Sequence, residues 1–107
     1  MRTIPIELCD GADDQTNIAA IERACAAAGL RLTMKGTLRA YRGCVHWHFK
    51  RGRERGTLEA TSWPRERRAW FSVHAGRSAA WIANVLPRIK ESLDSIAALP
   101  EQGFPNP

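Results

Sequence analysis

The chain has 107 residues and a formal net charge of +5; 44% of its residues are hydrophobic and 25% are charged. These values fit a single soluble globular domain, which at this length buries a core without disulfide or metal staples. The positive charge favours acidic partners such as nucleic acid, although a modest net charge also serves solubility alone.

Three cysteines, Cys9, Cys25 and Cys44, are widely spaced and form no C-x-x-C motif. This excludes a disulfide framework and a zinc ribbon, and it favours a reducing compartment. The N-terminal segment carries acids and a proline where a signal peptide has an apolar core, and no apolar run approaches the ~20 residues that span a bilayer. We therefore expect a cytoplasmic protein with no membrane partner.

The first elements are a short strand and a helix. Residues 1–9 alternate weakly and are a candidate edge strand, because Pro5 argues against a central one. Residues 10–15 are rich in aspartate and suit the start of a helix. Apolar residues then recur at helical spacing over residues 16–28, and Gly29 is placed to end the helix.

Residues 30–41 alternate with period two, which predicts a half-buried strand. The expected inward side holds Leu30, Leu32, Met34, Gly36, Leu38 and Ala40. A two-residue turn at 42–43 would then set the register with the next strand. That register pairs Tyr41 with Cys44, Arg39 with His46 and Thr37 with His48.

Three more strands are predicted at residues 44–50, 57–63 and 69–74, joined by the cationic loops 51–56 and 64–68. The predicted inward residues are Val45, Trp47, Phe49, Leu58, Ala60, Ser62, Ala69, Phe71 and Val73. The predicted outward residues are Cys44, His46, His48, Lys50, Thr57, Glu59, Thr61, Trp63, Trp70, Ser72 and His74.

A final helix is expected over residues 79–98, with a strong apolar stripe and a kink or restart near residue 86 caused by Pro87. Together the elements predict an α+β two-layer sandwich in the order α-β-β-β-β-α. Its sheet is an antiparallel four-stranded meander, with the N-terminal segment as a candidate fifth edge strand and both helices on one face. Residues 1–99 form this single domain, and residues 100–107 are expected to be a flexible tail.

The meander sorts the basic side chains between the two ends of the sheet, because alternate loops emerge at opposite ends. One end gathers Lys50 and the arginines of loop 51–56 beside Arg77 and the start of the last helix, which suits phosphate binding. The alternative is that these arginine-rich turns are simply solvated.

Trp63 and Trp70 are expected to oppose each other on the outward face, where cations flank them. Such stacking platforms hold single-stranded nucleic acid on sheet surfaces, but the pair would also stabilise a hairpin or a homodimer interface. The residues predicted to bind nucleic acid or phosphate are Arg31, Lys35, Arg39, Lys50, Arg51, Arg53, Arg55, Trp63, Trp70 and Arg77.

The same register brings His48, Glu59 and His74 into one row, with His46 and Cys44 nearby. Two histidines and a carboxylate suit a divalent metal, whereas a polar cross-strand ladder is the structural alternative. The sequence contains no P-loop, G-x-S-x-G or H-E-x-x-H motif, so no cofactor is predicted and no residue is assigned as catalytic.

The leading functional hypothesis is therefore binding of RNA or DNA by the outward sheet face and the basic loops. A protein-interaction module, as a homodimer through the same face, is the alternative. A small metal-dependent enzyme using His48, Glu59 and His74 is the second alternative.

Overall fold

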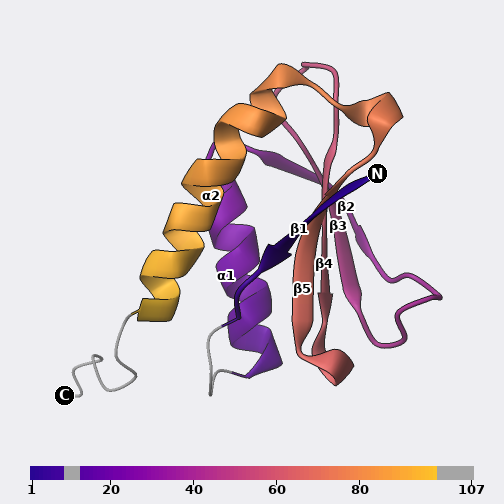
Figure 1. Ribbon diagram of the computed structural model, residues 1–107, viewed down its shortest axis with the longest axis vertical. Helices are drawn as coiled ribbons and strands as arrows, with labels where there is room; N and C mark the ends of the chain where they lie inside the picture. Colours follow the sequence, from indigo (N-terminus) through magenta and orange to yellow (C-terminus); the bar gives the residue numbers. More distant parts are fainter. Residues whose placement is uncertain (9–12, 99–107) are drawn as a thin grey trace.

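Five antiparallel strands form one sheet with two helices packed on a single face of it, as the computed structural model shows for residues 1–8 and 13–98 (Figure 1). The elements are β1 (Arg2–Ile6), α1 (Asp14–Ala27), β2 (Arg31–Gly36), β3 (Val45–Lys50), β4 (Leu58–Trp63), β5 (Arg68–Val73) and α2 (Ala80–Ala98). Short 3-10 turns lie at Pro64–Glu66 and Ala75–Arg77. The predicted α+β fold is confirmed, whereas Cys9 and the predicted tail lie outside the described residues.

The strand order is β1-β5-β4-β3-β2, so the N-terminal segment is indeed a fifth strand at one edge. Pro5 lies opposite Trp70 of β5. A proline is tolerated there because one side of an edge strand makes no ladder hydrogen bonds.

Local signals position α1 against the sheet. The carboxylate of Asp13 accepts the Thr16 amide hydrogen at 2.8 Å and caps the helix. The helix ends before Gly29, whose φ of +84° suits glycine, and the Leu30 amide returns to the Cys25 carbonyl at 3.1 Å. The second helix, α2, is continuous through Pro87. Of the two outcomes predicted there, a kink or a restart, the restart does not occur.

The core lies between the helices and the inner sheet face. Its fully buried members include Ile21 of α1, Ile89 of α2 and, from the sheet, Trp47, Leu58 and Phe71. The inward assignments for β3, β4 and β5 are confirmed. The core includes Trp47, Phe49, Leu58, Ala60, Ala69, Phe71 and Val73, with Val45 packed against it, and Ser62 lies between Val45 and Ala69 in the register.

The predicted register of β2 is wrong. The pairing shifts between Leu32 and Met34, which is a β-bulge, and Met34 and Gly36 then lie opposite His48 and His46 on the outer face. Lys35 lies instead on the helix side, with its Nζ 2.6 Å from Oε2 of Glu22. Leu32 and Met34 remain 45% and 38% exposed, so the edge strand is only weakly constrained by burial.

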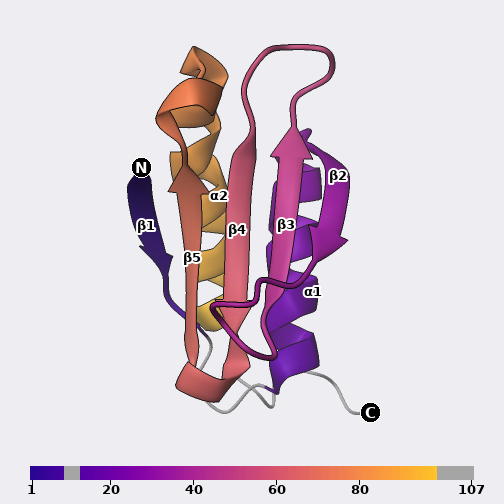
Figure 2. The ribbon, with the colours of Figure 1, turned by 90° about the vertical axis from the view of Figure 1, so that its right-hand side faces the viewer.

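The strand also ends early, because residues 37–44 leave the sheet edge and fold across the outer face (Figure 2). Cys44 is buried there, and its Sγ accepts the Leu38 amide hydrogen at 3.2 Å. The predicted pairs of Tyr41 with Cys44, Arg39 with His46 and Thr37 with His48 are therefore absent from the described register.

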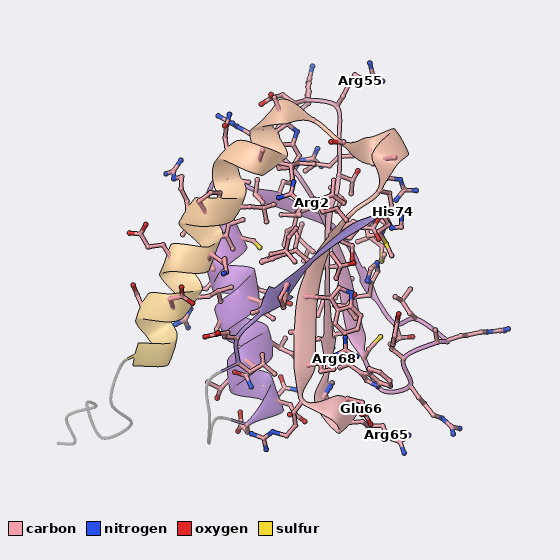
Figure 3. All side chains as sticks on the ribbon, in the orientation of Figure 1. Arg2, Arg55, Arg65, Glu66, Arg68 and His74 are labelled. Atoms are coloured by element: carbon pink, nitrogen blue, oxygen red, sulfur yellow. The ribbon has the colours of Figure 1, made fainter. Side chains whose placement is uncertain are left out.

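The two ends of the sheet carry different loops, as predicted from the meander. Figure 3 places Arg55 at one end, and Arg65, Glu66 and Arg68 at the other. Among residues 1–8 and 13–98, none of the helices has the length and apolar character needed to cross a membrane.

Candidate metal centre and the adjoining basic hollow

Glu59 lies near the start of β4, on the outer face of the sheet, and it is only 5% exposed. The register places His48 of β3 on one side of it and Ser72 of β5 on the other. The predicted row of His48, Glu59 and His74 is therefore wrong on β5, where Ser72, two residues before His74, lies opposite Glu59. His74 nevertheless reaches the carboxylate from just beyond the end of β5.

All three histidines of the chain converge on this one carboxylate. The Nε2 atoms of His46 and His48 lie 3.0 and 3.5 Å from Oε1 of Glu59. The Nε2 atom of His74 lies 3.3 Å from the other oxygen, Oε2. Oε2 also accepts a hydrogen bond from Nη1 of Arg77 at 3.1 Å. The two carboxylate oxygens thus face different partners.

Burial falls steadily across the three imidazoles, whose side chains are 5%, 23% and 46% exposed for His46, His48 and His74. Figure 3 shows His74 at the open side of the sheet. Burial lowers the pKa of His48, and the nearby Glu59 carboxylate opposes that shift in part. The neutral imidazole of His48 is therefore favoured.

Hydrogen bonds hold the most buried imidazole in place. Nδ1 of His46 lies 2.8 Å from Oγ1 of Thr61, a buried neighbour on β4. Because both ring nitrogens of His46 have hydrogen-bond partners, Nδ1 with Thr61 and Nε2 with Glu59, the orientation of the ring is fixed. Among the described residues, no buried side-chain nitrogen or oxygen lacks a hydrogen-bond partner. The cluster is thus satisfied as it stands, with Arg77 as the counter-charge of the buried carboxylate.

His46, His48 and Glu59 each offer one ligand atom, and these atoms lie within 4.8 Å of one another. Metal–ligand bonds of ~2.0–2.1 Å at a tetrahedral angle separate two ligand atoms by roughly 3.3–3.4 Å. The two distances to Oε1, 3.0 and 3.5 Å, lie on either side of that value. Two of the three ligand separations are therefore near the tetrahedral value, and the third, between the two imidazole nitrogens, is at most 4.8 Å. The 3.0 Å contact of His46 with Glu59 is at the same time a hydrogen bond.

Sequence reasoning noted His46 only as a neighbour and placed His74 in the predicted set instead. The alternation H-x-H does carry the signal, because residues two apart on a strand share a face. The sequence does not show which oxygen of Glu59 each histidine contacts. His74 contacts Oε2, whereas His46 and His48 contact Oε1. It also missed Arg77 as the ion-pair partner of Glu59.

A hollow of about 490 Å³ adjoins the cluster at the end of the sheet that carries loop 51–57. It is lined by Thr33, His48, Lys50, Arg55, Gly56, Thr57, Gly76 and Arg77. A smaller depression of about 360 Å³ shares Gly76 and Arg77 with it and reaches Glu59 and His74. His48 and Arg77 therefore touch both the carboxylate and the hollow.

The predicted cations at this end have separate roles. Arg31 donates to the Gly52 carbonyl at 2.8 Å, and Lys50 donates to the Gly56 carbonyl at 3.2 Å. Arg51 pairs with Glu54, its Nε lying 3.3 Å from Oε2. Arg53 and Arg55 on the same loop are exposed, as is Arg39 in the segment 37–44 that crosses the outer face.

The predicted pairing of the two tryptophans is wrong. Trp63 lies opposite Arg68, and Trp70 lies opposite Thr61. Tyr41 from the loop that crosses the sheet contacts both indoles edge-on, each at a centroid distance of 5.0 Å. Trp70 is only 8% exposed as a result, because the loop covers it.

Comparison of the chain with protein-family models, curated proteins and solved structures found no significant match.

Proposed function

We propose that the protein binds a divalent transition-metal ion through Nε2 of His46, Nε2 of His48 and Oε1 of Glu59. The observation that carries the proposal is the convergence of these three ligand atoms within 4.8 Å of one another, with both imidazole nitrogens 3.0–3.5 Å from the same carboxylate oxygen. A hydrogen-bonded ladder requires only one close contact per imidazole, and it does not require two imidazoles to share one carboxylate oxygen.

The ligand types favour Zn²⁺ over the hard cations. Imidazole nitrogens suit zinc, iron and nickel, whereas Ca²⁺ and Mg²⁺ prefer oxygen ligands alone. Three protein ligands leave a fourth position open in a tetrahedral zinc site. Because His48 also lines the hollow, a molecule bound in the hollow would lie beside an ion held by His48.

The surrounding contacts support the same assignment. Thr61 orients His46 through Nδ1, which leaves Nε2 for the metal. Arg77 and His74 hold Oε2 of Glu59, and this leaves Oε1 directed at the two ligand histidines. His74 is in this account an outer partner of Glu59.

The test is a titration of the full chain with Zn²⁺ and Co²⁺ after removal of metal by a chelator. Isothermal calorimetry gives the Zn²⁺ affinity, and the visible absorption of Co²⁺ reports its coordination number. We expect His46→Ala, His48→Ala and Glu59→Gln each to weaken binding more than 100-fold, beyond the ~10–100-fold typical of losing an outer partner.

His74→Ala is the matched control, because His74 contacts the same carboxylate through its other oxygen. We expect a loss of roughly tenfold. If His74→Ala weakens binding as much as His48→Ala while His46→Ala has no effect, the ligand set His48, Glu59 and His74 replaces ours. Wild-type protein that binds neither ion while folded, as judged by circular dichroism, contradicts the proposal.

Binding of RNA or DNA stays a prediction, and so does a homodimer through the outer face. The exposed cations of loop 51–57 support nucleic-acid binding, since phosphate contacts supply most non-specific affinity. Trp70 does not offer its indole for stacking with a base, because Tyr41 covers it.

A further inference from the structure

We propose that the basic hollow beside Glu59 binds a phosphoryl group, and that the metal ion and the phosphoryl group each strengthen the binding of the other. The inference deepens the proposed function by naming the ligand class that meets the open position of the metal. It rests on the proposed function for the coupling, whereas the hollow can be tested without metal.

The hollow is cationic and large enough for such a ligand. Three of its eight lining residues, Lys50, Arg55 and Arg77, are basic, and none is acidic. Its volume of about 490 Å³ lies within the ~300–1,000 Å³ of small-molecule sites. Thr33 and Thr57 add hydroxyl groups to the lining.

The walls of the hollow are held by contacts between loop 51–57 and the start of α2. The Thr57 amide donates to the Arg77 carbonyl at 2.9 Å. The indole of Trp81, which sequence reasoning overlooked, donates to the Arg55 carbonyl at 2.7 Å. Gly56 permits the close approach, because a Cβ there would lie 2.7 Å from the Cβ of Ala79. A preorganised cationic site binds an anion with less ordering cost than a mobile arginine-rich turn.

Phosphoryl oxygens match these donors better than a carboxylate does. A guanidinium binds phosphate through two parallel hydrogen bonds, and an ammonium adds a point charge. Several cations around one hollow favour a doubly charged group over a singly charged one. The exposed side chain of Arg55 extends from the same end of the sheet (Figure 3).

Charge balance links the hollow to the metal. Without metal, the Arg77 cation and the Glu59 anion cancel, so the pair has a net charge of zero. A divalent ion on Oε1 raises the local charge to +2, while Arg77 stays beside the other carboxylate oxygen, Oε2. A phosphate dianion in the hollow restores neutrality and takes up the guanidinium of Arg77. Metal and phosphoryl group therefore bind with positive coupling, and the coupling is reciprocal.

The experiment measures binding of phenyl phosphate by calorimetry, first to metal-free protein and then to the Co²⁺-loaded protein. We expect the affinity to rise roughly 5- to 150-fold when metal is present, the usual range of coupling between sites. Lys50→Ala and Arg55→Ala should each weaken binding about tenfold, as expected for one charge-assisted contact. Arg65→Ala, at the opposite end of the sheet, is the charge-matched control and should leave the affinity unchanged.

A parallel titration with a short single-stranded oligonucleotide identifies the source of the phosphoryl group. Backbone phosphates each carry a single charge, so tighter binding than phenyl phosphate, with the same dependence on Lys50 and Arg55, indicates a nucleic-acid backbone and contradicts the preference for a dianion; equal or weaker binding supports a small phosphate monoester. If the metal-loaded protein binds neither probe, the inference fails while the metal site stands. If phosphate binds the metal-free protein in a Lys50-dependent way and no metal binds, the proposed function and the coupling fail and the hollow site remains. Equal losses in Arg65→Ala and Lys50→Ala overturn the hollow as the site.

Discussion

Gly56→Ala tests the packing of the loop that forms the hollow. Gly56 has a φ of +102°, and an added Cβ would lie 2.7 Å from the Cβ of Ala79, 3.1 Å from the Arg77 carbonyl oxygen and 3.3 Å from Nε1 of Trp81. The positive φ costs an L residue ~1–2 kcal/mol, and overpacking adds ~1–3 kcal/mol. We therefore expect a loss of about 2–5 kcal/mol in the free energy of unfolding.

Gly52→Ala is the matched control in the same loop. Gly52 also has a positive φ, +55°, but nothing lies within 4 Å of its added Cβ. Its expected loss is only the conformational cost of ~1–2 kcal/mol. Urea unfolding followed by far-ultraviolet circular dichroism measures both variants. Equal losses in the two variants would refute the close packing of loop 51–57 against the start of α2.

Three further predictions concern other parts of the fold. Tyr41→Ala should lower the free energy of unfolding by about 2–4 kcal/mol, because it removes two edge-on aromatic contacts. Tyr41→Phe should change it by less than ~0.5 kcal/mol. If urea unfolding shows no difference between the two variants, Tyr41 does not cover the outer face as described. Burial raises the pKa of the Cys25 thiol to about 12. Mass spectrometry after iodoacetamide treatment at neutral pH should therefore find Cys25 alkylated in urea and unmodified in the native protein. Rapid alkylation of the native protein would contradict the burial of Cys25. Lys35 lowers the pKa of the Glu22 carboxyl below its ordinary 4.5, so Glu22→Gln should lower the free energy of unfolding by ~0.2–1 kcal/mol at pH 7. This difference from wild type should vanish as the pH falls through the folded-state pKa of Glu22. A difference that persists in urea unfolding at pH 2 would show that the ion pair is not its cause.

Period-two patterns predicted the central strands well, because the packing of one apolar face against the helices fixes their register. Val45, Trp47 and Phe49 face the helices as expected, and this placement necessarily puts His46 and His48 on the outer face. The same kind of pattern failed on β2. Side chains of an edge strand are largely exposed to solvent, so burial does not fix which of them face the core. A bulge near Thr33 and an early end at Gly36 therefore interrupt β2 despite its alternating sequence.

The candidate site was only half predictable, for a similar reason. The contact of Glu59 with His48 follows from strand register, since neighbours on one face of a sheet are set by sequence spacing. The contact with His74 does not, because His74 lies just beyond the end of β5. The burial of Trp70 does not, because it depends on Tyr41 folding across the sheet from a loop whose path has no periodic signal. The ion pair of Arg77 with Glu59 likewise depends on the short turn Ala75–Arg77. The sequence alone does not distinguish a basic turn residue that pairs with a buried carboxylate from one that is simply solvated.

The central claim is that His46, His48 and Glu59 bind one divalent metal ion. The most direct measurement is the Co²⁺ absorption spectrum of metal-stripped wild-type protein, titrated beside Glu59→Gln. Our account predicts the intense visible bands of a tetrahedral site, saturating at about one ion per folded chain in the wild type and absent from the variant. Folded wild-type protein that develops no such bands, or bands that are unchanged in Glu59→Gln, would contradict it.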